Sequence, residues 1–101
     1  MIHYINLFEV PDGREDEFFT MFLEINEHMA AHPGYLGHRM HRAVGADAKY
    51  RFINYVQWAS VEDLRAAHDE RFRALVSRPE WRDFVATPAV YDVVHERTAA
   101  A

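Results

Sequence analysis

The sequence lacks cysteine altogether, and no part of it is continuously apolar for the ~20 residues that a membrane-spanning helix needs. The absence of cysteine excludes disulfides and thiolate metal sites, and it fits the reducing cytoplasm. The first ten residues have no basic region and no cleavage pattern, so they indicate a strand and not a signal peptide. We therefore expect a cytoplasmic protein with no membrane segment.

Positive charge is also scarce, because 11 Lys and Arg face 16 Asp and Glu, for a formal net charge of −5. This balance gives no electrostatic reason to bind nucleic acid or anionic lipid. The chain has no glycine-rich phosphate loop, no G-x-S-x-G motif and no paired carboxylates in an apolar context. Nucleotide use and hydrolysis are therefore disfavoured, and small molecules or other proteins remain as partners.

Apolar residues make up half of the 101 positions, which is enough for one modest core in a single globular domain. We expect that domain to span residues 1–97. Residues 98–101 are small and indicate a frayed tail. No repeat or linker suggests a second domain.

Hydrophobic periodicity and helix breakers predict the element order β-α-β-β-α-β. Apolar residues that alternate predict strands, and apolar residues spaced by three or four predict helices. The predicted strands cover 2–10, 35–44, 51–58 and 89–97, the helices cover 14–31 and 61–77, and a short helical piece covers 79–84. Thr87 and Pro88 are expected to end that piece, with Pro88 as a helix breaker. This order predicts an α+β fold of the ferredoxin-like type, in which one antiparallel four-stranded sheet carries both helices on one face.

The third predicted strand is apolar on both sides, since Ile53 and Tyr55 alternate with Val56 and Trp58. The helices cover only one face of the sheet, so the other face needs a cover of its own. A second copy of the chain, related by two-fold symmetry, is the simplest cover. We therefore expect a homodimer that forms through the sheet face.

The stretch FINYVQWASVEDLRAAH, from Phe52 to His68, gives the best lead to a functional site. A strand leads directly into a helix that Ser60 can cap, with Asp63 completing a capping box. His68 lies on the apolar face of that helix, and Asn54 and Trp58 share one face of the strand. An imidazole, an amide and an indole could therefore meet between the sheet and the helix.

Several segments together resemble the antibiotic biosynthesis monooxygenase family: Val10–Phe18, the Pro33-Gly34-Tyr35-Leu36 junction and Tyr55–Ser60. The resemblance covers roughly residues 2–95. It implies a dimeric α/β barrel with a ligand pocket in each subunit, between the sheet and the helices. Members of this family include oxygenases that oxidise phenolic or anthrone-type polyketide intermediates without metal or flavin, and others degrade haem. The fold alone does not choose among these activities.

Oxygenation without a cofactor needs a base that forms the substrate anion, donors that hold its charge, and apolar walls that exclude water. We assign the catalytic roles to Asn6, as an amide donor, and His68, as the base. The haem-degrading relatives also carry a pocket Asn at the position that matches Asn6. Molecular oxygen is the expected co-substrate, with no cofactor. The expected substrate-binding residues are Tyr4, Phe22, His38, Asn54, Trp58 and Phe72.

Each of these assignments has a structural alternative. Asn6 could form a hydrogen bond to a neighbouring loop or strand, as buried amides usually do. Trp58 could simply pack in the core, and His68 could be a core histidine or reach water at the margin of its stripe. The role of Asn54 depends on which face of its strand points at the helices.

The haem-degrading branch of the family carries a Trp nine positions after the strand-end Trp, and a haem-ligating His ten positions beyond that. Here the two positions hold Ala67 and Ser77. His68 lies about 100° around the helix from the first of them. Haem degradation is therefore not expected.

Glu24, His28 and His32 lie four apart on the first predicted helix, and a His pair at this spacing can chelate a divalent ion. The stripe is offset from the apolar face and has no third ligand of the HExxH type. We interpret it as solvated or as lying at the dimer edge, and we expect no metal. His38 and His41 are three apart in a strand, so they point to opposite faces and cannot share an ion.

The sequence thus predicts a cofactor-independent monooxygenase that oxidises a phenol, an anthrone or a polyketide-type aromatic molecule. Two alternatives stay open. A polyketide cyclase or isomerase would use the same base and donor, and a non-catalytic dimeric accessory protein would fill the pocket with its own side chains.

Overall fold

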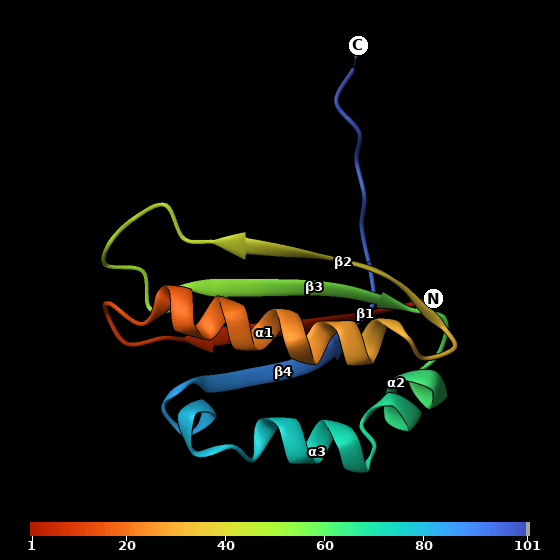
Figure 1. Ribbon diagram of the computed structural model, residues 1–101. Coiled ribbons are helices and arrows are strands. Elements are labelled where there is room, and N and C mark those ends of the chain that lie inside the picture. Colours follow the sequence, from red (N-terminus) through yellow and green to blue (C-terminus); the bar gives the residue numbers. More distant parts are fainter. Residues whose placement is uncertain (101) are drawn as a thin grey trace.

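The computed structural model describes residues 1–100 and contains one sheet with its helices on one side (Figure 1). The sheet has four antiparallel strands in the order β2-β3-β1-β4. The predicted ferredoxin-like order is confirmed, although the second helical segment is divided. The elements are β1 (Ile2–Glu9), α1 (Glu15–Ala30), β2 (Tyr35–Arg42), β3 (Phe52–Trp58), α2 (Val61–Ala67), α3 (Glu70–Val76), a 3-10 helix (Pro79–Asp83) and β4 (Val85–Tyr91).

The two central strands, β1 and β3, present every second side chain to the helices. Burial alternates along β3, so that Asn54 is buried while Tyr55 beside it is exposed on the opposite face. In the register of the sheet, Asn6 of β1 lies directly opposite Asn54 and, on its other side, opposite Pro88 of β4. Two amide side chains therefore stand next to each other at the centre of the helix-facing side.

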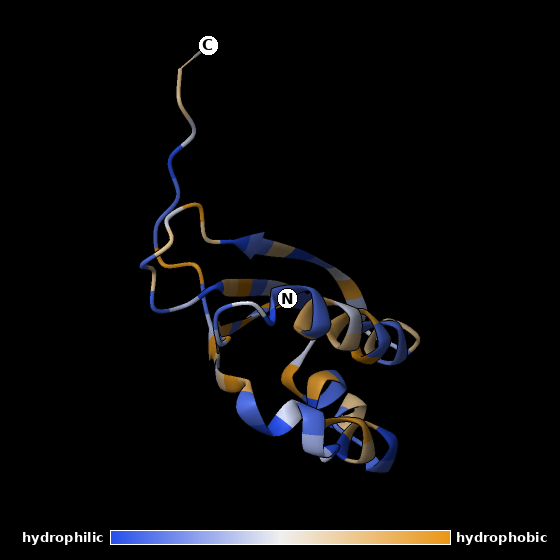
Figure 2. Cartoon of the chain, turned by 60° about the vertical axis from the view of Figure 1, so that its left-hand side comes forward, coloured by the Kyte–Doolittle hydropathy of each residue, from blue (hydrophilic) through white to orange (hydrophobic). Residues whose placement is uncertain are grey.

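The core between the sheet and the helices consists of two clusters of buried apolar side chains. Each helix carries hydrophobic and hydrophilic residues in alternation (Figure 2), as expected for helices with one buried face. No helix within residues 1–100 has the length and apolar content needed to cross a membrane. One cluster contains Ile25, Met29, Val56, Trp58, Leu64, Ala67 and Leu75, and the other contains Phe8, Val10, Phe18, Phe22, Phe52 and Phe84.

The loop between α1 and β2 depends on Gly34, which has a φ of +86°. This left-handed conformation favours glycine, and a side chain at this position would also run into Asp63. Asp63 is itself held by the start of α2, because its backbone N–H donates to the Ser60 hydroxyl at 3.1 Å. The predicted Ser60 N-cap is thus present, and its hydroxyl donates in turn to the Asp63 carboxylate at 3.0 Å, although the bond from the Ser60 backbone N–H that defines a full capping box is not found within residues 1–100.

The prediction of one continuous helix over 61–77 is wrong, because the helix breaks at His68 and Asp69. Asp69 has an extended backbone, and its carboxylate accepts the backbone N–H of Phe72 at 2.9 Å as the N-cap of α3. That hydrogen bond, followed by those from His28 and His32, holds the pKa of the Asp69 carboxyl well below its usual range. The apolar spacing continues across the break, so periodicity alone could not show it.

The last strand is also shifted, to residues 85–91 instead of the predicted 89–97. Pro88, which we took as a helix breaker, lies within β4. Because β4 is an edge strand bonded only to β1, a residue without an N–H can face its open edge. Residues 92–100 have no regular structure and run away from the body (Figure 1), and the last residue of the expected tail 98–101 lies outside the described part.

We predict that Phe18→Ala destabilises the fold strongly. The Phe18 ring is fully buried, and its centroid lies 4.9 Å from that of Phe8 and 4.8 Å from that of Phe52. Its removal should lower the free energy of unfolding, measured by chemical denaturation, by about 3–5 kcal/mol. The half-exposed Leu23 on the same helix is the control, and Leu23→Ala should change stability by less than about 0.5 kcal/mol. Similar losses in both variants would contradict this account of the core.

Candidate active site

A cavity of about 90 Å³ lies between the helix-facing side of the sheet and the helices. Residues of both core clusters line it, since Phe22 belongs to one cluster and Val56 to the other. The roles proposed for the lining residues stay predictions, but the structure brings most of the expected set together. The predicted site residues that line the cavity are Tyr4, Asn6, Phe22, Asn54, Trp58, His68 and Phe72.

Asn6 stands in the middle of β1 and presents its amide to the cavity. Its side-chain oxygen is buried and has no hydrogen-bond partner among residues 1–100. A buried acceptor without a partner costs about 1–3 kcal/mol of stability. The alternative in which Asn6 bonds a neighbouring strand or loop through this oxygen is therefore not what the structure shows, and the oxygen is free to accept a hydrogen bond from a bound molecule.

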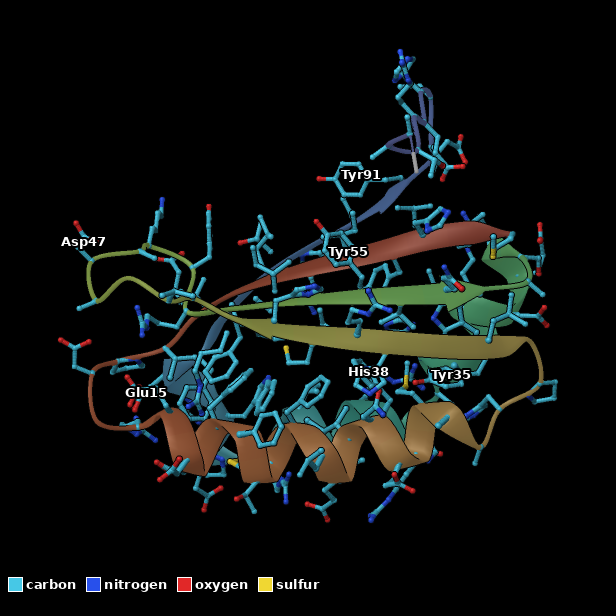
Figure 3. The ribbon with its side chains drawn as sticks, turned by 90° about the horizontal axis from the view of Figure 1, so that it is seen from above. Glu15, Tyr35, His38, Asp47, Tyr55 and Tyr91 are labelled. Carbon is cyan, nitrogen blue, oxygen red and sulfur yellow. The ribbon has the colours of Figure 1, made fainter. Side chains whose placement is uncertain are left out.

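Asn54 faces the helices and is buried with 5% of its surface exposed. Its side-chain oxygen accepts a hydrogen bond from Nδ1 of His38 at 2.9 Å. His38 itself does not line the cavity, which corrects the expectation that it contacts substrate directly. It points from β2 toward α1 (Figure 3), where its ring lies 5.7 Å from that of Phe22. His38 therefore holds the Asn54 amide in place, and its N–H fixes which atom of that amide is the acceptor.

His68 lies at the junction between α2 and α3, where it is the C-cap of α2. Its Nδ1 is 2.8 Å from the carbonyl oxygen of Leu64, and a carbonyl can only accept, so Nδ1 carries the proton. In the neutral ring Nε2 then carries a lone pair. The ring is fixed edge-on between Tyr4 and Phe72, with centroid distances of 5.7 and 4.5 Å. The break in the helix thus supplies a positioned imidazole with a basic nitrogen.

Tyr4 is the other titratable group on the cavity wall. Burial raises the pKa of its phenol above the ordinary value, because the charged form loses its hydration. The hydroxyl therefore stays protonated at neutral pH and can act as a hydrogen-bond donor. Trp58 is only 1% exposed and packs edge-on against Tyr35 at 5.4 Å, so it forms a rigid wall of the cavity and also part of the core.

Eight lining residues were not assigned to the site by the sequence reasoning, and among them Trp81 and Asn26 carry groups that can form hydrogen bonds. Trp81 of the 3-10 helix lines the cavity and stacks on Phe18, with 5.5 Å between the ring centroids. Nothing in the local pattern connects this lone Trp with the cavity. Asn26 also lines it, and its position four residues after Phe22 did carry a signal, because that spacing places it beside the inward stripe of α1.

The stripe of Glu24, His28 and His32 on α1 is not simply solvated. Glu24 pairs at 2.7 Å with Arg78, which lies just before the 3-10 helix. Both histidines contact the carboxylate of Asp69, so a third side chain that the sequence reasoning did not connect with them completes a group. None of the three side chains His28, His32 and Asp69 lines the cavity, although Asp69 follows His68 in the chain and bonds the backbone of Phe72.

The fold and this arrangement match a known family. The model of the antibiotic biosynthesis monooxygenase family matches residues 1–87, and the chain belongs to that family. No curated protein matches the chain. Membership supports monooxygenase activity at the level of the family.

Several solved structures are similar to the chain. A candidate monooxygenase from Shewanella loihica PV-4 is 27% identical with a TM-score of 0.83, and the match covers 94% of this chain and 95% of that one. SnoaB, a cofactor-independent oxygenase from Streptomyces nogalater, is 20% identical with a TM-score of 0.78 over 94% of each chain. MhuD, a heme-degrader from Mycobacterium tuberculosis with two hemes bound in its active site, is 24% identical with a TM-score of 0.71 over 97% of this chain and 100% of that one. The last two likenesses show the shared fold alone.

The residues of this chain do not fit the haem-degrading pattern. The position of the haem-ligating His holds Ser77, which is exposed and donates its hydroxyl to the backbone carbonyl of Arg73. The position of the catalytic Trp holds Ala67, which is buried in the core. We therefore derive no step through haem.

We predict opposite effects on stability for the two facing amides. Asn6→Leu removes an oxygen that has no partner, so the free energy of unfolding should stay equal or rise by up to about 1 kcal/mol. Asn54→Leu breaks the hydrogen bond from His38 and should lower the free energy of unfolding by about 1–3 kcal/mol. Denaturant titration of both variants makes the comparison, and a larger loss for Asn6→Leu than for Asn54→Leu would mean that Asn6 has a structural partner.

Proposed function

We propose that this protein is a cofactor-independent monooxygenase that oxidises a phenolic or anthrone-type aromatic molecule with molecular oxygen. One observation carries the proposal: a single apolar cavity holds both the unpartnered amide oxygen of Asn6 and the imidazole of His68, with its basic Nε2. An acceptor and a base left free in an otherwise apolar cavity are arranged for a substrate that loses a proton. Family membership supports the same type of reaction.

The reaction on an anthrone can be written with every atom placed. Nε2 of His68 takes a proton from the acidic carbon, and the resulting anion passes one electron to dioxygen. The substrate radical and superoxide combine through a new carbon–oxygen bond, and the imidazolium returns its proton to the peroxide. Cleavage of the oxygen–oxygen bond, with loss of the second hydrogen of that carbon, then releases water and leaves a carbonyl. Anthrone and dioxygen thus give anthraquinone and water.

The polar groups of the cavity have separate tasks in this scheme. The amides of Asn6 and Asn54 face the same space and can donate N–H groups to the substrate oxygen on which negative charge develops. The protonated hydroxyl of Tyr4 can do the same. The aromatic walls formed by Trp58 and Phe72 exclude water and pack against a flat ring.

The size of the cavity requires the structure to open before a substrate with several rings can bind. Its volume of about 90 Å³ is smaller than the ~150 Å³ that holds one benzene ring. The segment best suited to move is the junction at His68 and Asp69, because it joins two helices of only seven residues each. We propose that this junction moves away from the sheet when substrate enters.

We predict that the full-length protein consumes dioxygen with anthrone and forms anthraquinone faster than buffer alone. His68→Gln should slow the reaction by about 10²–10⁴-fold, because it removes the base. Asn6→Leu should slow it by about 10²-fold, because it removes an amide from the cavity. His95→Gln is the matched control, since His95 is exposed in the irregular segment after β4 and should leave the rate unchanged. An oxygen electrode measures the dioxygen consumed, and absorbance measures the anthraquinone formed.

Three outcomes would overturn this function. Product formation from a polyketide without dioxygen would indicate a cyclase or isomerase. A Soret band on titration with haem, together with haem turnover, would indicate haem degradation. No acceleration by the wild-type protein, together with no binding of anthrone, 1-naphthol or haem, would indicate an accessory protein whose cavity its own side chains fill.

We also propose that the protein is a homodimer formed through the open face of the sheet. Ile5, Leu7 and Ile53 lie on that face, and no helix within residues 1–100 covers it. Tyr55 and Tyr91 point away from the helices on the same side (Figure 3), with 44% and 47% of their surfaces exposed. A two-fold contact of this face with itself would bury these apolar side chains.

We predict that Ile53→Asp converts the dimer to a monomer, because it places a charge in the middle of the contact. Sedimentation equilibrium should give about twice the mass of one chain for the wild type and one chain mass for the variant. Val44→Asp introduces the same charge in the loop after β2, where Val44 is fully exposed, and should remain dimeric. A monomeric wild type, or a dimer that survives Ile53→Asp, would contradict this interface.

A further inference from the structure

A second group of chemistry-bearing side chains lies outside the cavity, where the C-terminal turns of α1 meet the junction before α3. Nε2 of His28 lies 2.9 Å from Oδ1 of Asp69, and Nε2 of His32 lies 2.9 Å from Oδ2. The three potential ligand atoms all lie within 4.8 Å of one another. The two imidazole rings stand edge-on, with 4.7 Å between their centroids. Two nitrogens and one carboxylate therefore converge from the last turn of α1, the turn that follows it and the N-cap of α3.

The hydrogen bonding of His32 implies that this group needs a cation. Nδ1 of His32 is 2.9 Å from the carbonyl oxygen of His28, and a carbonyl can only accept, so Nδ1 carries the hydrogen. In the neutral ring Nε2 is then an acceptor, and it faces the carboxylate oxygen of Asp69, which is also an acceptor. Two acceptors at this distance repel each other unless a cation lies between them. That cation is either a second proton on His32 or a metal ion.

The surroundings of the three side chains match those of a metal site. Metal-binding histidines usually donate their other ring N–H to a carbonyl, and His32 does so to His28. Ligating carboxylates are usually held by a further hydrogen bond, and Asp69 accepts the backbone N–H of Phe72. The side chains of His28, His32 and Asp69 are 22%, 19% and 35% exposed. An ion can therefore enter, and water can complete its coordination.

We propose that His28, His32 and Asp69 bind a divalent transition-metal ion, for which Zn²⁺ is the best match. Two imidazole nitrogens and one carboxylate oxygen, without thiolate, are a common zinc ligand set, and a water would supply the fourth position. Ligand atoms in a tetrahedral zinc site lie about 3.4 Å apart, which small rotations of these side chains reach. Binding displaces the proton that His28 shares with Asp69. The ion would tie α1 to the junction that carries His68, and so restrain the segment next to the cavity.

Calorimetric titration of the untagged, metal-free full-length chain with ZnCl₂ tests this site. The expected result is one ion per chain and a Tm that rises with Zn²⁺ concentration. His32→Gln and Asp69→Asn should each weaken binding at least about tenfold. Asparagine is as good an N-cap as aspartate, so Asp69→Asn keeps the start of α3. Glu24→Gln, on the same stripe but paired with Arg78, and His41→Gln, on the open sheet face, are the controls and should bind like the wild type.

X-ray absorption at the zinc edge gives a second measurement that needs no variant. It should show two imidazole nitrogens and oxygen ligands at about 2.0–2.1 Å. A wild-type Tm that Zn²⁺ does not change would overturn the site and leave a doubly protonated His32 as the cation. Equal affinity in the wild type and both ligand variants, or loss of binding in His41→Gln, would place the zinc elsewhere. These measurements read out binding and not turnover, so they stand or fall independently of the oxygenase proposal.

Discussion

The facing pair of amides at the centre of the sheet is the constraint on which the rest of this structure depends. Asn6 and Asn54 are direct neighbours across β1 and β3, on the side that packs against the helices. They place polar groups in a cavity wall that is otherwise built largely from residues of the two core clusters. Since His38 holds only Asn54, the amide of Asn6 is left to interact with whatever occupies that space.

Asp69 links the two functional features of the molecule. By capping α3 it ends the helical segment at His68, which frees the imidazole from a regular helix and places it against Tyr4 and Phe72. The same carboxylate also contacts the Nε2 atoms of His28 and His32. A change at this one residue would therefore affect the geometry of the cavity wall and the contact between α1 and α3 together. This connection explains why the wall of the cavity that carries His68 is built from two short helices.

Much of the fold and of the cavity wall could be predicted from the sequence, because alternation and helical spacing report which side chains are buried. The errors have physical causes. The capping of α3 by Asp69 does not disturb the apolar spacing, so periodicity could not show the break between α2 and α3. Pro88 was taken as a helix breaker, although an edge strand such as β4 tolerates proline. His38 and Trp81 depend on tertiary contacts, with Asn54 and Phe18 respectively, that no local pattern encodes. The contacts of His28 and His32 with Asp69, which lies 41 and 37 residues away, are also tertiary contacts that no local pattern encodes.

The central claim is that a basic ring nitrogen of His68 is held ready in the cavity. Long-range ¹H–¹⁵N NMR of the imidazole rings, recorded with and without 1-naphthol under conditions where the ring is neutral, tests it most directly. The account predicts that His68 carries its proton on Nδ1, and that the Nε2 resonance and the side-chain amide of Asn6 both shift when the phenol binds. A His68 ring protonated on Nε2, with neither resonance moved by saturating 1-naphthol, would contradict it.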